Sequence, residues 1–140
     1  MKDGILLALV AIMVTGWLVG CGKASSTGML VEYHRSGGFA GLDDHLVIME
    51  DGESILTRKS ERYEFSLDRD TVAGLQSLFE DAAFSQLGTE SLPSRQGADL
   101  FEYVVTYEGH TVRTMDGAVP PSLQPILEAL DQIVEDQGKP

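Results

Sequence analysis

Apolar and polar residues alternate through the middle of the chain with the two-residue period that is typical of half-buried β-strands. The alternation is clearest between residues 100 and 107, where four large side chains fall on one face and are expected in the core: Phe101, Tyr103, Val105 and Tyr107. Similar patterns predict strands at about 29–34, 45–50, 54–67 and 110–115. Polar residues at 59–61 interrupt the third of these, so 54–67 forms either one bent strand or two.

Two segments have the period of an amphipathic helix instead. The first begins near Asp68, the expected cap, and ends around residues 83–84. Its apolar residues share one face: Val72, Leu75, Leu78, Phe79 and Ala82. In the second, apolar residues repeat every three or four positions between residues 123 and 134. Because proline is tolerated only in the first turn of a helix, Pro125 fixes its start and makes Ser122 the expected cap, and Gly138 is expected to end it.

Short connections join most of these elements. Asp51-Gly52 is a strong hairpin signal, and Glu108-Gly109 is expected to turn the chain between the last two strands. Residues 85–99 are expected to form a long loop. The element order β-β-β-α-β-β-α predicts an α+β domain, with an antiparallel sheet of about five strands and two helices packed on one face. The other face is then expected to be wet or to cover a partner.

The N-terminus has the features of an export signal followed by a membrane anchor. Residues 1–20 are typical of a signal peptide, because a short charged head precedes an apolar run from Ile5 to Val19. The run ends in Leu18-Val19-Gly20-Cys21, which resembles the bacterial lipobox, where acyl chains such as palmitate are attached to the cysteine. The resemblance implies a lipoprotein held by acylated Cys21 to membrane lipid in the cell envelope, outside the cytoplasm. Residues 21–28 would form a lipidated, flexible tether and residues 29–140 a single domain.

Two other interpretations of the N-terminus stay open. The segment from Gly4 to Gly22 contains no charge and is just long enough to cross a bilayer, so it would serve as an uncleaved signal anchor. Ordinary cleavage would instead leave Cys21 as a free cysteine. Because Cys21 is the only cysteine, no intramolecular disulfide can form.

The charge balance excludes several classes of partner. The chain has 22 acidic residues against 10 basic ones, a formal net charge of −12. Nucleic-acid binding needs a basic surface that neutralises phosphates, so no nucleic-acid partner is expected. Binding to anionic lipid by charge alone is disfavoured for the same reason.

Candidate catalytic and metal-binding residues are few. The three histidines, His34, His45 and His110, lack the spacing of helical zinc ligands. His34 and His45 with Asp43 and Asp44 form the only local ligand cluster, and its simpler interpretation is two strand ends that face water across a loop. Ser36 lacks the surroundings of a nucleophile elbow. We therefore expect no enzymatic activity, no cofactor and no metal.

The stretch Arg35-Ser36-Gly37-Gly38-Phe39-Ala40-Gly41 is the candidate contact loop. Its three glycines permit backbone conformations that other residues avoid. Phe39 has no periodic partner in the neighbouring strands. It either tucks back onto the sheet or projects as the anchor of an interface, and the chemistry of the stretch leaves both open.

This stretch resembles the glycine loop of the emfourin family, small bacterial proteins that inhibit thermolysin-like zinc metallopeptidases such as protealysin. The similarity continues through Ala83-Phe84-Ser85-Gln86-Leu87, Asp99-Leu100-Phe101-Glu102-Tyr103 and the terminal helix, and covers most of residues 30–134. The chain departs from the family in its lipid-anchored N-terminus, which emfourin-type inhibitors need not have.

The resemblance implies inhibition by occlusion of an exported metallopeptidase. The domain would present residues 35–41 to the substrate cleft, and Phe39 would fill the pocket for an apolar side chain beside the scissile bond. Arg35 and an acidic neighbour, Asp43 or Asp44, would pair at the rim.

Two competing functions stay open. One is a non-inhibitory envelope lipoprotein that binds or scaffolds a partner through the same loop. The other is a hidden hydrolase, which would need His34, His45 and Asp44 gathered in a cleft.

Overall fold

The computed structural model describes residues 28–95, 97 and 99–139. The expected signal peptide, Cys21 and most of the tether lie outside these residues. Within the described part, no helix is long and apolar enough to cross a membrane.

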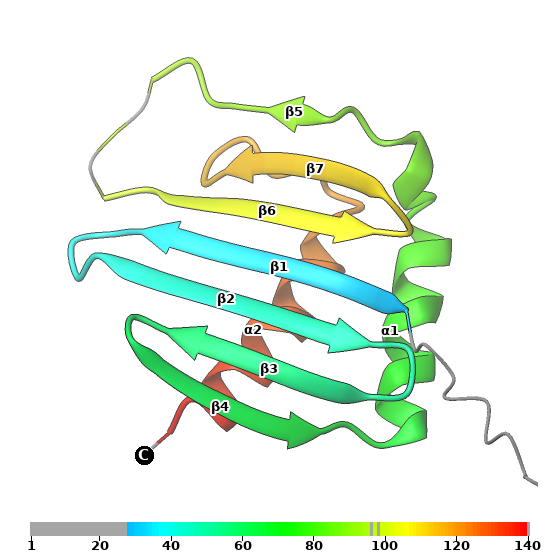
Figure 1. Ribbon diagram of the computed structural model, residues 1–140. Coiled ribbons are helices and arrows are strands. Elements are labelled where there is room, and N and C mark those ends of the chain that lie inside the picture. Colours follow the sequence, from blue (N-terminus) through cyan, green and yellow to red (C-terminus); the bar gives the residue numbers. More distant parts are fainter. Residues whose placement is uncertain (1–27, 96, 98, 140) are drawn as a thin grey trace, which may run out of the picture.

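The domain is built on one sheet of seven strands in the order β4-β3-β2-β1-β6-β7-β5 (Figure 1). The strands span Met29–Gly37 (β1), Leu42–Met49 (β2), Glu53–Arg58 (β3), Glu61–Ser66 (β4), Glu90–Ser91 (β5), Phe101–Tyr107 (β6) and His110–Met115 (β7). Neighbouring strands are antiparallel except β5, which runs parallel to β7. The predicted α+β class is confirmed, and β1 and β2 lie in the middle of the sheet.

The number of strands differs from the predicted five. The segment 54–67 forms two strands, because Lys59 takes a left-handed conformation (φ 55°) and turns the chain between β3 and β4. β5 lies inside the expected loop 85–99 and makes the sheet mixed. With only two residues, β5 is too short to produce an alternating pattern. The first strand also continues three residues past the predicted end at His34, so Arg35, Ser36 and Gly37 belong to β1.

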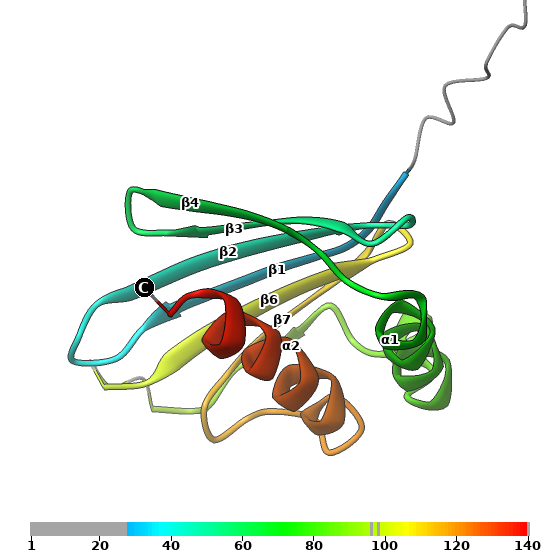
Figure 2. The same ribbon diagram turned by 90° about the horizontal axis from the view of Figure 1, so that it is seen from below.

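Both helices cover the same face of the sheet (Figure 2). α1 spans Arg69–Asp81, and the carboxylate of Asp68 accepts a hydrogen bond from the backbone N–H of Thr71 (2.8 Å), which confirms the predicted cap. α2 spans Gln124–Gln137 with Pro125 in its first turn. The predicted cap at Ser122 is wrong: Leu123 holds that position without a side-chain hydrogen bond, because residues 121–123 already form a turn. Gly138 ends α2 as predicted.

The core lies between the helices and the sheet. Phe79 of α1 stacks on Tyr107 of β6, with ring centroids 4.1 Å apart, and Phe84 packs edge-on against both. From α2, four buried side chains complete the layer: Ile126, Leu127, Leu130 and Val134. The predicted core positions Tyr103, Val105 and Tyr107 are buried, and Phe101 packs half-buried at their edge.

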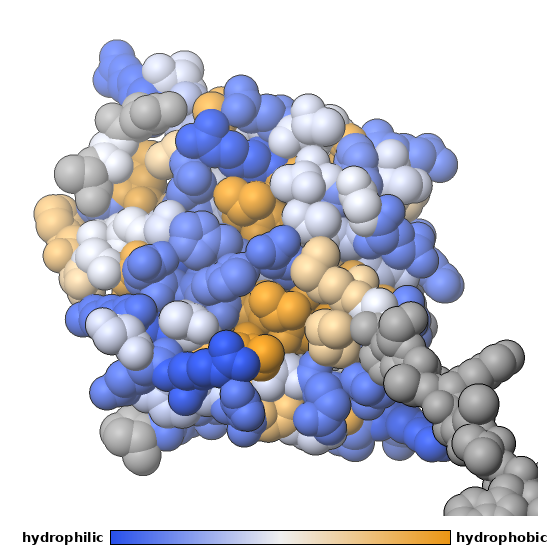
Figure 3. Space-filling view, viewed as in Figure 1, coloured by the Kyte–Doolittle hydropathy of each residue, from blue (hydrophilic) through white to orange (hydrophobic). Residues whose placement is uncertain are grey.

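The opposite face of the sheet carries no helix within the described chain. Figure 3 shows it as a mostly polar surface with small apolar areas. Val47, Ile55 and Val104 are half-buried there, and the side chains of Glu32 and His45 lie beside them. The helices cover one face of the sheet as expected, and whether the other face covers a partner stays a prediction.

Candidate functional site

A four-residue turn, Gly38–Gly41, joins the two central strands, β1 and β2, at one end of the strands. The N–H of Gly41 donates to the carbonyl oxygen of Gly38 (3.0 Å), which closes the turn. The N–H of Gly38 donates to the carbonyl oxygen of Leu100 (3.2 Å), which ties the turn to the segment just before β6. The turn is thus held at both ends by backbone hydrogen bonds.

The glycines of this turn are required by its geometry. Gly37, Gly38 and Gly41 all have positive φ, at 110°, 69° and 56°. A Cβ at Gly37 would clash with the carbonyl oxygen of Leu100, and one at Gly38 would lie 2.7 Å from the ring of Phe101. A Cβ at Gly41 would meet nothing within 4 Å. Gly37 and Gly38 therefore allow close packing, whereas Gly41 is needed only for its backbone conformation.

Phe39 projects from the tip of the turn and is 91% exposed. Of the two arrangements that the sequence left open, the structure has the projecting one. Its neighbours Ala40 and Gly41 are also exposed. The ring of Phe39 is therefore accessible for contact with a partner.

Behind the turn, Arg35 enters a buried ion network on the helix side of the sheet. Its guanidinium donates to Asp44 on the neighbouring strand (2.7 Å), and to Asp131 (3.0 Å) and Glu135 (2.8 Å) on α2. Arg58 of β3 donates to the other oxygen of Asp44 (2.7 Å). Asp44 is fully buried and Arg35 is 8% exposed. The network therefore joins three strands to the C-terminal helix.

The pKa values in the network follow from burial and pairing. Burial alone would raise the pKa of Asp44, but hydrogen bonds from Arg58 and Arg35 outweigh it and hold the pKa below its usual value. The hydrogen bond from Arg35 lowers the pKa of Glu135. Burial raises the pKa of Asp131, although Tyr33 donates to it (2.6 Å). Burial, followed by this same hydrogen bond, raises the pKa of Tyr33 well above its usual range.

Arg35 has one of its two expected partners, Asp44, but the pair is buried and does not lie at the rim. Arg35 pairs with Asp44 inside the domain, because these two residues lie directly opposite each other and point toward the helices. Asp43 points to the other face, where its carboxylate is 2.7 Å from Nε2 of His34. Of the nine residues assigned to partner binding, Phe39, Ala40 and Gly41 are exposed and Arg35 and Asp44 are buried. Asp43, with Ser36 opposite it, lies on the open face, and Gly37 and Gly38 are half-buried at the base of the turn. Their contact with a partner stays a prediction.

His34 and His45 are not gathered with Asp44 on one face of the sheet. His34 and His45 are cross-strand neighbours on the open face, with ring centroids 6.1 Å apart, and His45 faces Glu32 (2.8 Å). Asp44 lies on the opposite face, so the arrangement that a hidden hydrolase would need is absent. Among the described residues, no group of three or more His, Cys, Asp or Glu is placed to hold a metal ion.

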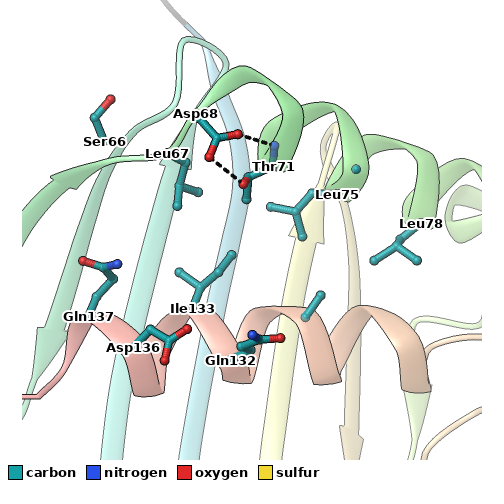
Figure 4. Close-up of a pocket in the computed structure, with 12 residues that line it drawn as sticks. Ser66, Leu67, Asp68, Thr71, Leu75, Leu78, Gln132, Ile133, Asp136 and Gln137 are labelled. Atoms are coloured by element: carbon teal, nitrogen blue, oxygen red, sulfur yellow. Dashed lines mark hydrogen bonds between the residues drawn. The ribbon is translucent and has the colours of Figure 1, made fainter.

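A concave surface lies between the two helices. This groove of about 680 Å³ has an apolar floor that includes Leu75, Leu78 and Ile133 (Figure 4). At its rim, Asp68 is already engaged as the helix cap. The groove lies between the helices and not beside the projecting turn.

Sequence reasoning missed part of the support behind the turn. Arg58, Asp131 and Glu135 were not singled out, although Asp131 and Glu135 are one helical turn apart on α2. The sequence did contain one signal, a charged residue on the apolar face of a strand. Tyr33, Arg35 and the apolar Val31 share one face of β1, so a charged residue had to be buried and to find partners.

The family model described as Emfourin matches residues 56–131, from β3 to the middle of α2. The matched region includes Ala83–Leu87 and Asp99–Tyr103, which carried part of the resemblance, but it begins after the Gly38–Gly41 turn. No curated protein matches the chain.

Asp44→Asn is expected to lower the free energy of unfolding by about 3 kcal/mol, because it removes the negative charge that compensates two guanidinium groups in a buried site. Asp43→Asn, at the adjacent position on the exposed face, is the matched control and should cost less than about 1 kcal/mol. Urea unfolding at neutral pH measures both. Equal losses in the two variants would contradict the assignment of Asp44 as the buried counter-ion.

The pH dependence of these variants gives a second readout. Folding lowers the pKa values of Asp44 and Glu135 below their ordinary values of 3.8 and 4.5. The two carboxylates therefore stabilise the folded domain at pH values above these ordinary pKa values, and this stabilisation is lost as the pH falls through their lowered pKa values. The raised pKa of Asp131 has the opposite sign and offsets part of this loss. The wild-type protein should therefore lose stability below about pH 4.5, with a shallower loss in Asp44→Asn.

Gly37→Ala is expected to destabilise the domain more than Gly41→Ala. Gly41→Ala should cost about 1–2 kcal/mol, since alanine has to adopt a left-handed conformation in open space. Gly37→Ala carries a similar backbone cost and also forces Leu100 away from the turn. The same unfolding measurement tests the difference, and equal costs would show that the close approach to Leu100 is not a constraint.

Proposed function

The chain belongs to the Emfourin family of protease inhibitors, whose model matches more than half of it, and we propose on this premise that it inhibits thermolysin-like zinc metallopeptidases. In this proposal the Gly38–Gly41 turn enters the substrate cleft and blocks it. The domain itself takes no part in catalysis.

The exposed ring of Phe39 is the observation that carries this mechanism. Thermolysin-like sites prefer an apolar side chain next to the scissile bond, and Phe39 presents one at the tip of a narrow turn. Aromatic anchors that fill a pocket contribute much of the binding energy of protein interfaces. Because the family match begins at Leu56, the role of this turn is supported by its geometry and not by the match.

The support behind the turn favours tight binding. Two backbone hydrogen bonds and the contact of Gly38 with Phe101 hold the turn before a partner arrives. The ion network of Arg35 fixes the strands that carry it. A loop that is already ordered loses less conformational entropy on binding than a flexible one.

The proposed lipid anchor is compatible with this orientation. β1 begins at Met29, at the end of the strands where α1 lies, and reaches the Gly38–Gly41 turn at their opposite end (Figure 1). Its nine residues span about 27 Å. A domain held near a membrane through the chain that precedes Met29 would therefore point Phe39 away from the lipid.

Phe39→Ala is expected to weaken inhibition of a thermolysin-like peptidase by about 30-fold, since loss of a central aromatic anchor costs roughly 2 kcal/mol. The inhibition constant is measured with a small peptide substrate and the full-length protein in mild detergent.

Met29→Ala is the matched control. Met29 and Phe39 are the two exposed large apolar residues of the described chain, and they lie at opposite ends of the sheet. The control should change the inhibition constant by less than about twofold. Equal changes of the inhibition constant in Phe39→Ala and Met29→Ala would contradict the proposed role of the turn. Absence of inhibition by the wild-type protein at micromolar concentration would instead favour a non-inhibitory binding module.

The lipid anchor has its own test. Cys21→Ala, expressed in a bacterium, is expected to shift the protein from the membrane fraction to the soluble one and to remove the mass of the acyl chains. Fractionation followed by mass spectrometry measures both. A variant that stays in the membrane at unchanged mass, apart from the substituted side chain, would show an uncleaved signal anchor.

A further inference from the structure

A shallow hollow of about 540 Å³ lies beside the Gly38–Gly41 turn. Leu42, the first residue after the turn, lines one side of it, and the β3–β4 connection at Lys59 and Ser60 lines another. The N–H of Lys59 donates to the carbonyl oxygen of Asp43 (3.1 Å), which fixes this connection against β2. Figure 1 shows both turns at the same edge of the sheet. The two turns therefore lie at the same end of the strands, and residues next to both of them line the hollow.

Lys59 is one of three non-glycine residues with a positive φ in the described chain, together with Ala83 and Glu108. Its φ of 55° lies in the left-handed region, which favours glycine and disfavours a residue with a Cβ. Glycine would relieve this strain, so the conformation of the turn does not explain the lysine. A strained residue on an exposed turn is a reason to look for a function of its side chain.

The charges around Lys59 leave its ammonium group available. Arg58, which also lines the hollow, is paired with Asp44, and Glu135 is paired with Arg35. The carboxylate of Glu61 accepts a hydrogen bond from Tyr63. Lys59 itself makes no ion pair with any residue that the structure describes, and it is exposed. In a chain with a net charge of −12, an exposed cation that pairs with no described residue, at the same end of the strands as the projecting aromatic ring, is a distinct local feature.

We propose that Lys59 is the second contact point of the inhibitory surface and pairs with a carboxylate at the rim of the peptidase's substrate cleft while Phe39 enters it. This inference rests on the proposed function and specifies the partner: a peptidase whose cleft has an acidic rim on the side that meets β3 and β4. Exposed charges at the rim of an interface act chiefly on the association rate and on its dependence on salt.

The test compares two charge reversals. Lys59→Glu is matched by Arg69→Glu, an exposed residue at the start of α1, on the opposite edge of the sheet, that also makes no ion pair with a described residue. Both variants change the net charge by the same amount, so a general electrostatic effect would appear equally in both. Association of the full-length protein with thermolysin is followed at low and moderate salt. Lys59→Glu should slow association about tenfold and weaken its salt dependence, whereas Arg69→Glu should change the rate by less than about twofold.

Lys59→Gly separates a binding role from a structural one. Glycine adopts the left-handed conformation without strain, so this variant should melt at the same or a higher temperature than wild type. It should nevertheless associate more slowly, because it lacks the ammonium group. A stable Lys59→Gly variant with the wild-type association rate would overturn the proposal.

The outcomes distinguish this inference from the proposed function. If wild type inhibits, Phe39→Ala weakens inhibition and Lys59→Glu behaves like Arg69→Glu, the role of Lys59 fails while the role of the turn stands. If wild type does not inhibit, both fail. A slower association specific to the Lys59 variants supports the acidic rim.

Discussion

The buried pairing of Arg35 with Asp44 is the interaction on which the arrangement of this domain depends. Two central strands place these residues directly opposite each other, and both side chains are buried on the helix side of the sheet. A buried guanidinium is tolerated only when carboxylates and hydrogen bonds compensate it. Asp131 and Glu135 supply that compensation from α2, and they thereby fix where the C-terminal helix lies over the sheet.

Strand alternation explains how one short segment serves two purposes. Successive residues of β1 and β2 point to opposite faces, so Arg35 and Asp44 support the fold from inside while His34 and Asp43 remain on the wet face. The alternation ends at Gly37, where positive φ values turn the chain and Phe39 leaves the sheet altogether. The Gly38–Gly41 turn is therefore an extension of two strands in the middle of the sheet. The proposed inhibitor needs this combination of an exposed tip and an ordered base.

Much of the fold could be predicted from the sequence, because its signals are local. The alternation at 101–107 and the helical repeat at 123–134 depend only on neighbouring residues, and both elements were found. β5 could not be found, since two residues show no period and their pairing with β7 is set by tertiary packing. The cap at Ser122 failed because residues 121–123 adopt a turn that propensity does not encode.

The candidate site was predictable in part for the same reason. Glycine spacing and a lone aromatic mark the turn within seven consecutive residues, and the exposure of Phe39 agrees with one of the two alternatives. The direction of Arg35 was missed, because its partners Asp131 and Glu135 lie almost a hundred residues away along the chain. A role for Lys59 could not be predicted from the sequence. Its left-handed conformation, and its place at the same end of the strands as the Gly38–Gly41 turn, appear only when β3 lies beside β2.

Occlusion of a substrate cleft makes a kinetic claim that can be checked without any variant. Steady-state hydrolysis of a small peptide by a thermolysin-like peptidase is measured at several concentrations of the wild-type protein. If the turn occupies the cleft, the apparent KM rises with inhibitor concentration while kcat is unchanged. A fall in kcat at constant KM would place the binding site elsewhere on the peptidase and contradict the account.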